Sequence, residues 1–192
     1  MSYSDDPLLD QIQSHDTIES MHASLVSPKR ILSGITPSGS ELHIGNYYGM
    51  VKPSLDLQNN DEYTTYYFIA DLHALTTVQD RAVLENNIQQ VVTDYLALGL
   101  DPDKSVFFRQ SHVPAHSQLA VVLANYVGYG QMQRMHAFKD KLQKGAETDS
   151  INMGLFNYPI LMAADILAYK PYGVPVGEDQ RQHVELTRDI AE

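Results

Sequence analysis

Three short apolar runs that alternate with helical segments constrain this chain most strongly. The runs cover residues 31–34, 66–70 and 105–108. Apolar residues at helical spacing follow the first run at about 44–57 and the second at 83–96, where Asp80 is a candidate helix cap. Strands that alternate with crossover helices predict a parallel sheet of the doubly wound α/β class.

The remaining chain predicts helices more than strands. Gly99 and Pro102 end the second helix, and the sequence after the third strand is mostly helical to about residue 169. A short piece at 174–176 and a last helix from about Glu178 complete the pattern. Residues 1–28 look like an N-terminal extension with no function to assign, and residues 29–192 form the domain.

Composition excludes several classes of protein and site. With 43% hydrophobic and 19% charged residues the chain is not a disordered one, and it has no apolar run of the ~18–20 residues that a membrane span needs. The absence of cysteine excludes disulfides, thiolate zinc sites, iron–sulfur clusters and cysteine nucleophiles. It also fits a reducing compartment, and since the N-terminus is acidic rather than signal-like, we expect a cytoplasmic protein.

The net charge argues against a surface that gathers nucleic acid. Thirteen basic and 24 acidic residues leave −11. The basic residues Arg134, Lys139, Lys141 and Lys144 nevertheless crowd into one stretch. This stretch either contacts phosphates or is an ordinary solvated helix face or loop.

The loop after the first strand has the composition of a phosphate site. In such sheets ligands bind beyond the carboxyl ends of the strands. Thr36 and Ser38 offer hydroxyls, and a helix that opens near Ile44 directs N–H groups at any phosphate. His43 is placed to donate to a phosphate oxygen as charge builds on it. The alternative is a turn that merely caps the helix.

Several sequence blocks carry a resemblance to a known family. HIGN at 43–46 resembles the HIGH signature of class I aminoacyl-tRNA synthetases, and SGITPSG at 33–39 resembles the tryptophanyl form of that loop. FIADLHALT at 68–76, YPILMAADI at 158–166 and VPVGEDQRQHVELTRDIAE at 174–192 follow in the family's order. The fourth signature residue is Asn46, a variant that the tryptophanyl enzymes share, and the loop is one residue longer than usual before His43.

The second block suits a flat aromatic ligand. Pro159 predicts that a helix begins there, and Tyr158, Met162 and Asp165 then share one face. Rings pack on Tyr158 and Met162, and Asp165 accepts a single N–H, which is where the family places its tryptophan-reading aspartate. The alternative is a core helix in which Asp165 caps or forms a salt bridge. His73 follows the second strand and either lines the pocket or packs in the core.

The third block places polar groups where a short strand passes into a helix. Asp179 is suited to ribose hydroxyls and Gln180 to the amino-acid substrate. An acidic cap on the last helix is an alternative that is compatible with both roles. His112 and His116 have metal-like spacing, but Pro114 spoils the helical geometry they would need, so we expect no metal site.

The resemblance assigns roles to residues of this chain. It implies a Rossmann-like catalytic domain with a helical insertion, in which His43, Asn46 and Lys141 are catalytic and Asp165, Tyr158, Met162, Gln180 and His73 bind tryptophan. ATP, as its Mg²⁺ complex, would contact Thr36, Pro37, Ser38, Gly45, Asn46, Gly177, Glu178 and Asp179.

The resemblance also implies an activity and partners. Such an enzyme activates L-tryptophan with ATP, transfers it to tRNA and works as a homodimer. A lysine-rich signature of the KMSKS type is expected as well, and none occurs up to Glu192. We therefore expect the N-terminal part of the enzyme, weak or inactive alone. A tyrosyl-type enzyme and a non-catalytic nucleotide- or tryptophan-binding module remain alternatives.

Overall fold

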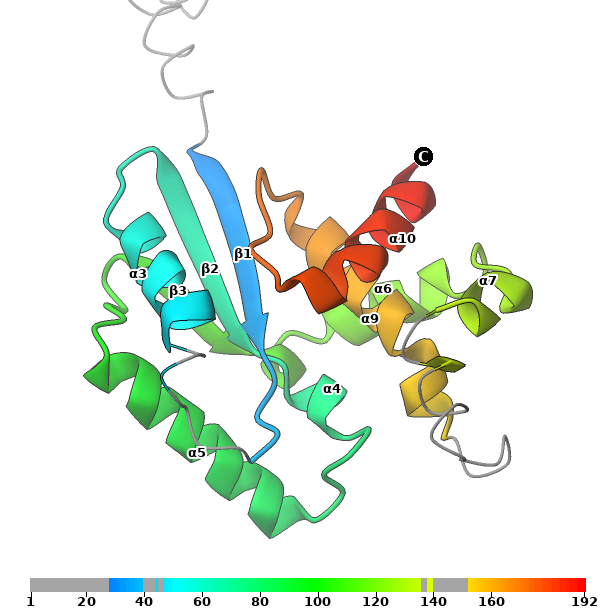
Figure 1. Ribbon diagram of the computed structural model, residues 1–192, viewed down its shortest axis with the longest axis horizontal. Helices are drawn as coiled ribbons and strands as arrows, with labels where there is room; N and C mark the ends of the chain where they lie inside the picture. The colour runs from blue at the N-terminus through cyan, green and yellow to red at the C-terminus, as the bar shows by residue number, and fades with distance from the viewer. Residues whose placement is uncertain (1–27, 40–43, 45–46, 136–137, 140–151) are drawn as a thin grey trace, which may run out of the picture.

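A three-stranded parallel sheet forms the centre of the molecule (Figure 1). The computed structural model describes residues 28–39, 44, 47–135, 138–139 and 152–192, so all but the last residue of the predicted N-terminal extension lies outside it. The strands are β1 (Lys29–Ile35), β2 (Tyr63–Ile69) and β3 (Ser105–Arg109), in the order β1-β2-β3. The predicted α/β class is confirmed.

Alternate residues of β2 serve two hydrophobic cores, one on each face of the sheet. Phe68 packs with Leu32 and with Ile166 of α9 (Met153–Tyr169). Tyr67 points to the other face and packs with Val51 and with Tyr95 of α5 (Arg81–Ala97). Since strand side chains alternate between faces, this pattern requires helices on both sides of the sheet. Figure 1 shows α3 (Lys52–Gln58) and α5 on one side and α9 on the other.

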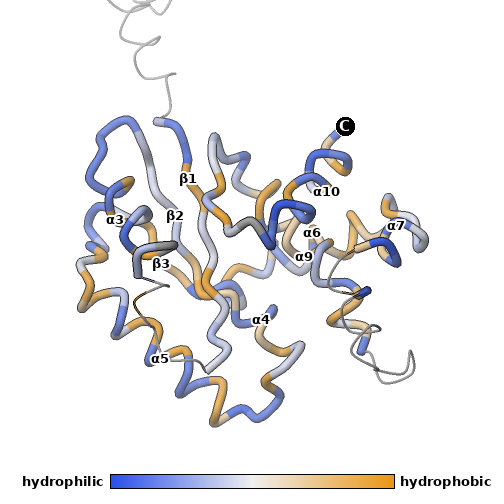
Figure 2. Tube along the Cα trace, viewed as in Figure 1, coloured by the Kyte–Doolittle hydropathy of each residue, from blue (hydrophilic) through white to orange (hydrophobic). Residues whose placement is uncertain are grey.

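The helix α5 follows the predicted pattern closely. The Asp80 carboxylate accepts a hydrogen bond from the Val83 N–H at 2.9 Å, which confirms the predicted cap. Hydrophilic and hydrophobic residues alternate along α5 in Figure 2, as expected for a helix with one buried side. Val83 and Leu96 were predicted on the buried side but are exposed, since they lie at the margins of the apolar stripe.

Prolines explain three differences from the predicted elements. The predicted helix at 44–57 is helical at Ile44 and from 47 to 58, but it is divided into a π-helical turn, η1 (Tyr47–Val51), and α3, where Pro53 has no N–H to continue a single helical ladder. Pro159 does not begin a helix: α9 starts earlier, where Asn152 accepts the Leu155 N–H at 2.8 Å. The piece at 174–176 contains Pro175 and is no strand, and only Gly173 forms an isolated bridge, to Ile31.

The predicted helical insertion packs around α9. Helices α6 (Ala115–Leu123) and α7 (Tyr129–Gln133) precede α9, and α10 (Arg181–Ala191) follows it after a 3₁₀ turn, η4 (Glu178–Gln180). Met132, Ile160 and Leu186 belong to their shared core. Two short elements, α4 (Asp71–Ala74) and η2 (Gln110–His112), continue β2 and β3. No helix among the described residues is long and apolar enough to cross a membrane.

Candidate active site

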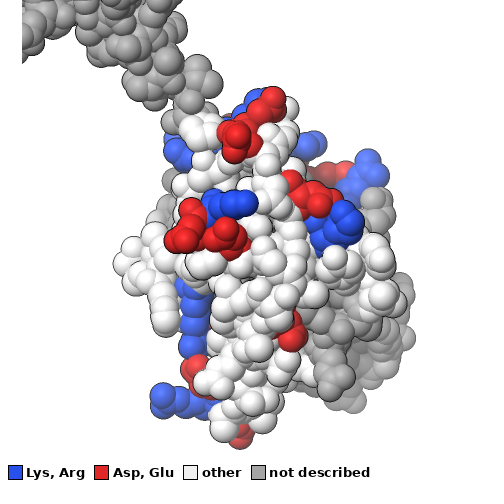
Figure 3. All heavy atoms as spheres, turned by 90° about the vertical axis from the view of Figure 1, so that its left-hand side faces the viewer, with Lys and Arg blue, Asp and Glu red and all other residues white. Residues whose placement is uncertain are grey.

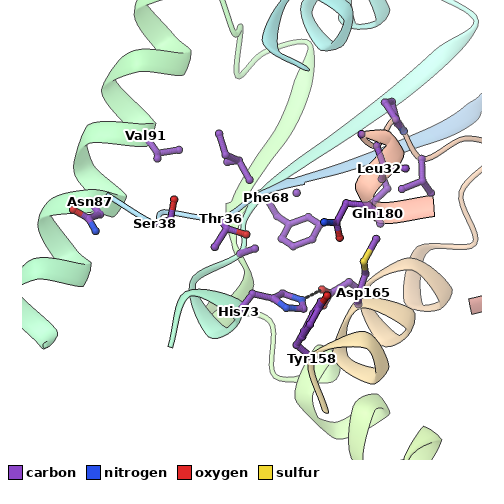
Figure 4. A pocket seen from close by; sticks show the side chains of 18 of the residues that line it. Leu32, Thr36, Ser38, Phe68, His73, Asn87, Val91, Tyr158, Asp165 and Gln180 are labelled. Carbon is purple, nitrogen blue, oxygen red and sulfur yellow. Dashed lines mark hydrogen bonds and ion pairs between the residues drawn. The ribbon is translucent and has the colours of Figure 1, made fainter. Parts of the chain in front are cut away.

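A cavity of about 1370 Å³ lies at the carboxyl ends of the strands, where ligands bind in this fold class (Figure 4). Its wall is formed by the loop after β1, by α4 and α5, by one face of α9 and by the chain from Val174 to Gln180. The structure brings these predicted site residues together on that wall: Thr36, Ser38, His73, Tyr158, Met162, Asp165, Gly177, Asp179 and Gln180.

The remaining predicted residues are not placed on the wall. His43, Gly45, Asn46 and Lys141 lie outside the described residues, and the side chain of Glu178 in η4 is not described either. Pro37 was predicted to contact ATP, but it is fully buried and does not line the cavity. Its carbonyl accepts a hydrogen bond from the Asn87 side chain at 3.3 Å, which ties the loop to α5.

The loop after β1 is a tight turn that leaves polar groups facing the cavity. The Ser38 N–H donates to the Thr36 carbonyl at 2.9 Å, and both residues are exposed. Gly39 has φ +86°, and a Cβ there would lie 2.9 Å from the Asn87 amide nitrogen. The backbone conformation therefore favours glycine at this position, and a larger residue would also require the Asn87 side chain to move.

The predicted face of α9 lines the opposite side of the cavity. Tyr158, Met162 and Asp165 all reach it, as their spacing predicts. The Tyr158 hydroxyl lies 2.6 Å from His183 Nε2, and its ring meets His73 edge-on with the centroids 6.1 Å apart. Tyr158 is therefore fixed both at its hydroxyl and along its ring.

Asp165 is the most strongly held group of the wall. It is 2% exposed, and its oxygens lie 2.8 Å from His73 Nε2, 2.6 Å from His116 Nδ1 and 2.8 Å from Gln110 Nε2. Burial alone would raise the pKa of Asp165, but the hydrogen bonds from His116, His73 and Gln110 hold it below its ordinary value. Asp165 lines the cavity and is also paired within the protein, so its position is compatible with both interpretations.

His73 likewise combines both of its predicted roles. Its side chain is 13% exposed, lines the cavity and contacts Asp165, as the dashed line in Figure 4 shows. His116 turns into the core, whereas His112 is exposed. The described residues contain no group of three or more histidine, aspartate or glutamate side chains arranged to hold a metal ion.

The sequence did not indicate Gln110 or the role of His116. Both are fully buried and contact Asp165, although 55 and 49 residues separate them from it in the chain. The only sequence signal for Gln110 is that it directly follows a strand, at the edge where such sheets bind ligands.

A compact turn presents the last group of predicted residues. The Gln180 N–H donates to the Gly177 carbonyl at 2.9 Å, and the Gln180 amide donates to the Asp179 carboxylate at 2.6 Å. A Cβ on Gly177 would lie 2.5 Å from Asp179 Oδ1, so a larger residue there would require the Asp179 side chain to move. Asp179 thereby stays exposed next to Gly177 on the cavity wall.

Residues 26–192 match the family described as tRNA synthetases class I (W and Y). The chain belongs to this family. The tryptophan–tRNA ligases of Corynebacterium glutamicum and Fusobacterium nucleatum are each 53% identical to it over 163 residues. These matches cover 85% of this chain but 46% and 48% of the two ligases, so the chain spans about half the length of the curated relatives it matches.

Solved structures of the family agree in fold. A tryptophanyl-tRNA synthetase from Campylobacter jejuni, complexed with ADP and tryptophan, is 44% identical with a TM-score of 0.77, over 84% of this chain and 49% of that one. A tyrosyl-tRNA synthetase from Aeropyrum pernix reaches a TM-score of 0.70 at 20% identity, over 92% of this chain and 52% of that one, and shows likeness of fold alone.

Proposed function

We propose that this chain is the N-terminal part of a tryptophan–tRNA ligase. The observation that carries the proposal is the buried Asp165 carboxylate on the cavity wall, on the same helix face as Tyr158 and Met162. A flat ring with one N–H fits that face, because the ring packs on Tyr158 and Met162 while Asp165 accepts the proton. The relatives named as tryptophan–tRNA ligases support the same substrate.

The proposed reaction uses the cavity's two sides for two substrates. Tryptophan lies against α9 and His73, with Gln180 near its amino-acid end. ATP, with its Mg²⁺, lies along Thr36, Ser38, Gly177 and Asp179, together with His43, Gly45, Asn46, Glu178 and, on the pyrophosphate side, Lys141. The tryptophan carboxylate attacks the α-phosphorus, the bond to the β-phosphate oxygen breaks, and pyrophosphate leaves. No protein nucleophile takes part, so catalysis is positioning and charge stabilisation.

The adenylate would then pass tryptophan to tRNA. On the face shown in Figure 3, basic and acidic side chains are interspersed and form no continuous basic surface. In α3, Lys52 and Asp56 form an exposed ion pair whose charged atoms lie 2.7 Å apart. We therefore expect the tRNA to bind through surfaces other than this face.

The amino-acid specificity has a direct optical test. The chain contains no tryptophan, so the emission of added L-tryptophan reports its binding without background from protein indole. We expect L-tryptophan to bind at least ~100-fold more tightly than L-tyrosine, whose affinity is measured by competition. Tighter binding of tyrosine would favour the tyrosyl-type alternative.

Tryptophan-dependent ATP–pyrophosphate exchange tests the alternative of a non-catalytic binding module. We expect exchange to be weak in this chain and strong in a longer chain with a KMSKS-type signature, and that result would exclude the binding module.

We also propose that the enzyme is a homodimer that uses the surface of α6 and α7. Val121, Tyr126 and Tyr129 are 70%, 78% and 65% exposed there, which is unusual for such large apolar side chains. Val121→Asp is expected to convert a dimer to a monomer in sedimentation experiments. Val83→Asp is the matched control on α5, because Val83 is an exposed valine as well, at 50%. A dimer that survives Val121→Asp would contradict this surface.

A further inference from the structure

Four structural elements meet at the carboxylate of Asp165. The acid itself belongs to α9, and its three donors are His73 of α4, Gln110 of η2 and His116 of α6. His73 lines the cavity, whereas Gln110 and His116 are fully buried and do not reach its wall. A ligand in the cavity can therefore touch Asp165 and His73, but it senses the other two donors only through Asp165.

The orientation of Gln110 is fixed from behind. The Leu72 N–H donates to Gln110 Oε1 at 3.1 Å, so the amide must direct its nitrogen toward Asp165. That nitrogen lies 2.8 and 2.9 Å from the two carboxylate oxygens and thereby fixes the plane of the carboxylate. The Ser111 N–H in turn donates to Asp71 at 3.0 Å, which ties η2 to α4 a second time.

His116 is held at both nitrogens by one face of α9. Nδ1 lies 2.6 Å from Asp165, and Nε2 lies 2.9 Å from the hydroxyl of Tyr169, one helical turn further on. An ionised carboxylate only accepts hydrogen bonds, so Nδ1 carries the proton. Burial raises the pKa of Tyr169, and its hydroxyl is positioned to donate a hydrogen bond to Nε2.

We propose that Gln110 and His116 are positioning residues that hold Asp165 in the plane and charge state that selects a ligand N–H. The inference rests on the proposed function, in which that N–H belongs to the indole of tryptophan. Shape recognition by Tyr158 and Met162 does not distinguish an indole from an isosteric ring without the N–H. The hydrogen bond to Asp165 does, and it depends on a carboxylate that neither rotates nor takes up a proton.

The test compares tryptophan with the amino acid in which benzothiophene replaces indole, so that sulfur stands where the N–H was. Ligand emission gives the tryptophan affinity, and competition gives that of the analogue. Unchanged protein is expected to prefer tryptophan by at least about tenfold. His116→Leu and Gln110→Leu are expected to lower this ratio about tenfold, with the affinity for the analogue changed less than about threefold. His112→Leu, which removes the exposed histidine nearby, should leave both affinities unchanged.

Two milder variants separate positioning from packing. His116→Asn supplies an amide N–H near the place of Nδ1, and we expect it to restore most of the preference that His116→Leu loses. Tyr169→Phe keeps the ring and removes only the hydroxyl that orients His116. It is expected to lower the ratio about two- to fivefold, and it provides the test if His116→Leu does not fold.

The outcomes distinguish this inference from the proposed function. If His116→Leu weakens both ligands equally, or if the ratio stays unchanged in that variant and in Tyr169→Phe, then the positioning role is wrong while tryptophan binding stands. Binding of tryptophan by the unchanged protein with no preference over the analogue would also overturn the inference, since Asp165 would then not read the N–H. Failure of the unchanged protein to bind tryptophan at all would overturn the proposed function and the inference with it.

Discussion

The two sides of the cavity are built in different ways. On the α9 side, Asp165 is 2% exposed and makes hydrogen bonds to three other elements. On the β1 side, Thr36 and Ser38 are exposed on a turn that Gly39 and Asn87 stabilise from behind. A buried carboxylate network suits a ligand with one polar atom to recognise, whereas backbone groups on a turn suit phosphates. Under the proposed function, substitutions on the α9 side should therefore affect folding as well as binding, whereas substitutions on the β1 side should affect binding alone.

The largest effect that tests this difference comes from paired substitutions on the two sides. Asp165→Asn places an amide N–H₂ against donors that need an acceptor, so we expect a loss of about 2–4 kcal/mol in the free energy of unfolding. Tryptophan affinity should fall at least ~100-fold in the same variant. Thr36→Val is expected to change stability by less than about 0.5 kcal/mol and to leave tryptophan affinity unchanged.

Urea unfolding and ligand emission measure both variants. ATP affinity is the second readout for Thr36→Val, and it should weaken because the hydroxyl is lost from the proposed nucleotide side. A Thr36→Val variant as unstable as Asp165→Asn would show that the two sides are equally coupled to the fold, and the contrast between them would be wrong.

The sequence predicts the local features of the site, but it does not predict the contacts between residues that lie far apart in the chain. The shared face of Tyr158, Met162 and Asp165 follows from helical spacing, and the Asp80 cap lies beside the helix it begins. Such signals are local, so they survive errors in the element boundaries, including the wrong start of α9 at Pro159.

The network behind Asp165 could not be predicted in this way. The donors from His73, Gln110 and His116 come from 92, 55 and 49 residues away, and only the packed sheet brings them together. A single sequence contains no periodicity that encodes such contacts. His116 illustrates this, since its spacing from His112 gave no indication that its partners would be an acid and a tyrosine of α9.

Acid should selectively weaken the hydrogen bonds that support the α9 side of the cavity. Two carboxyl groups are responsible, Asp71 of α4 and Asp165 of α9, because both have a lowered pKa. Burial alone would raise the pKa of Asp71, but hydrogen bonds from Ser111 and Arg109 lower it below its ordinary value. A carboxyl group with a lowered pKa in the folded state stabilises the protein above its unfolded pKa of about 3.9, and that stability is lost as the pH falls through the folded value. Stability should therefore decrease below about pH 4.

Asp71→Asn tests this dependence and has a matched control on the same arginine. The variant leaves the Arg109 guanidinium without its buried partner, so we expect a loss of about 2 kcal/mol at pH 7 and a shallower fall in stability below pH 4. Glu85→Gln removes the other partner of Arg109, whose side chain is 42% exposed, and should change stability little because solvent screens that pair. Urea unfolding between pH 3 and pH 7 gives both curves. If the two variants lost equal stability, the exposed Glu85 would support Arg109 as much as the buried Asp71 does, and burial would not be the reason that the Asp71 pair matters.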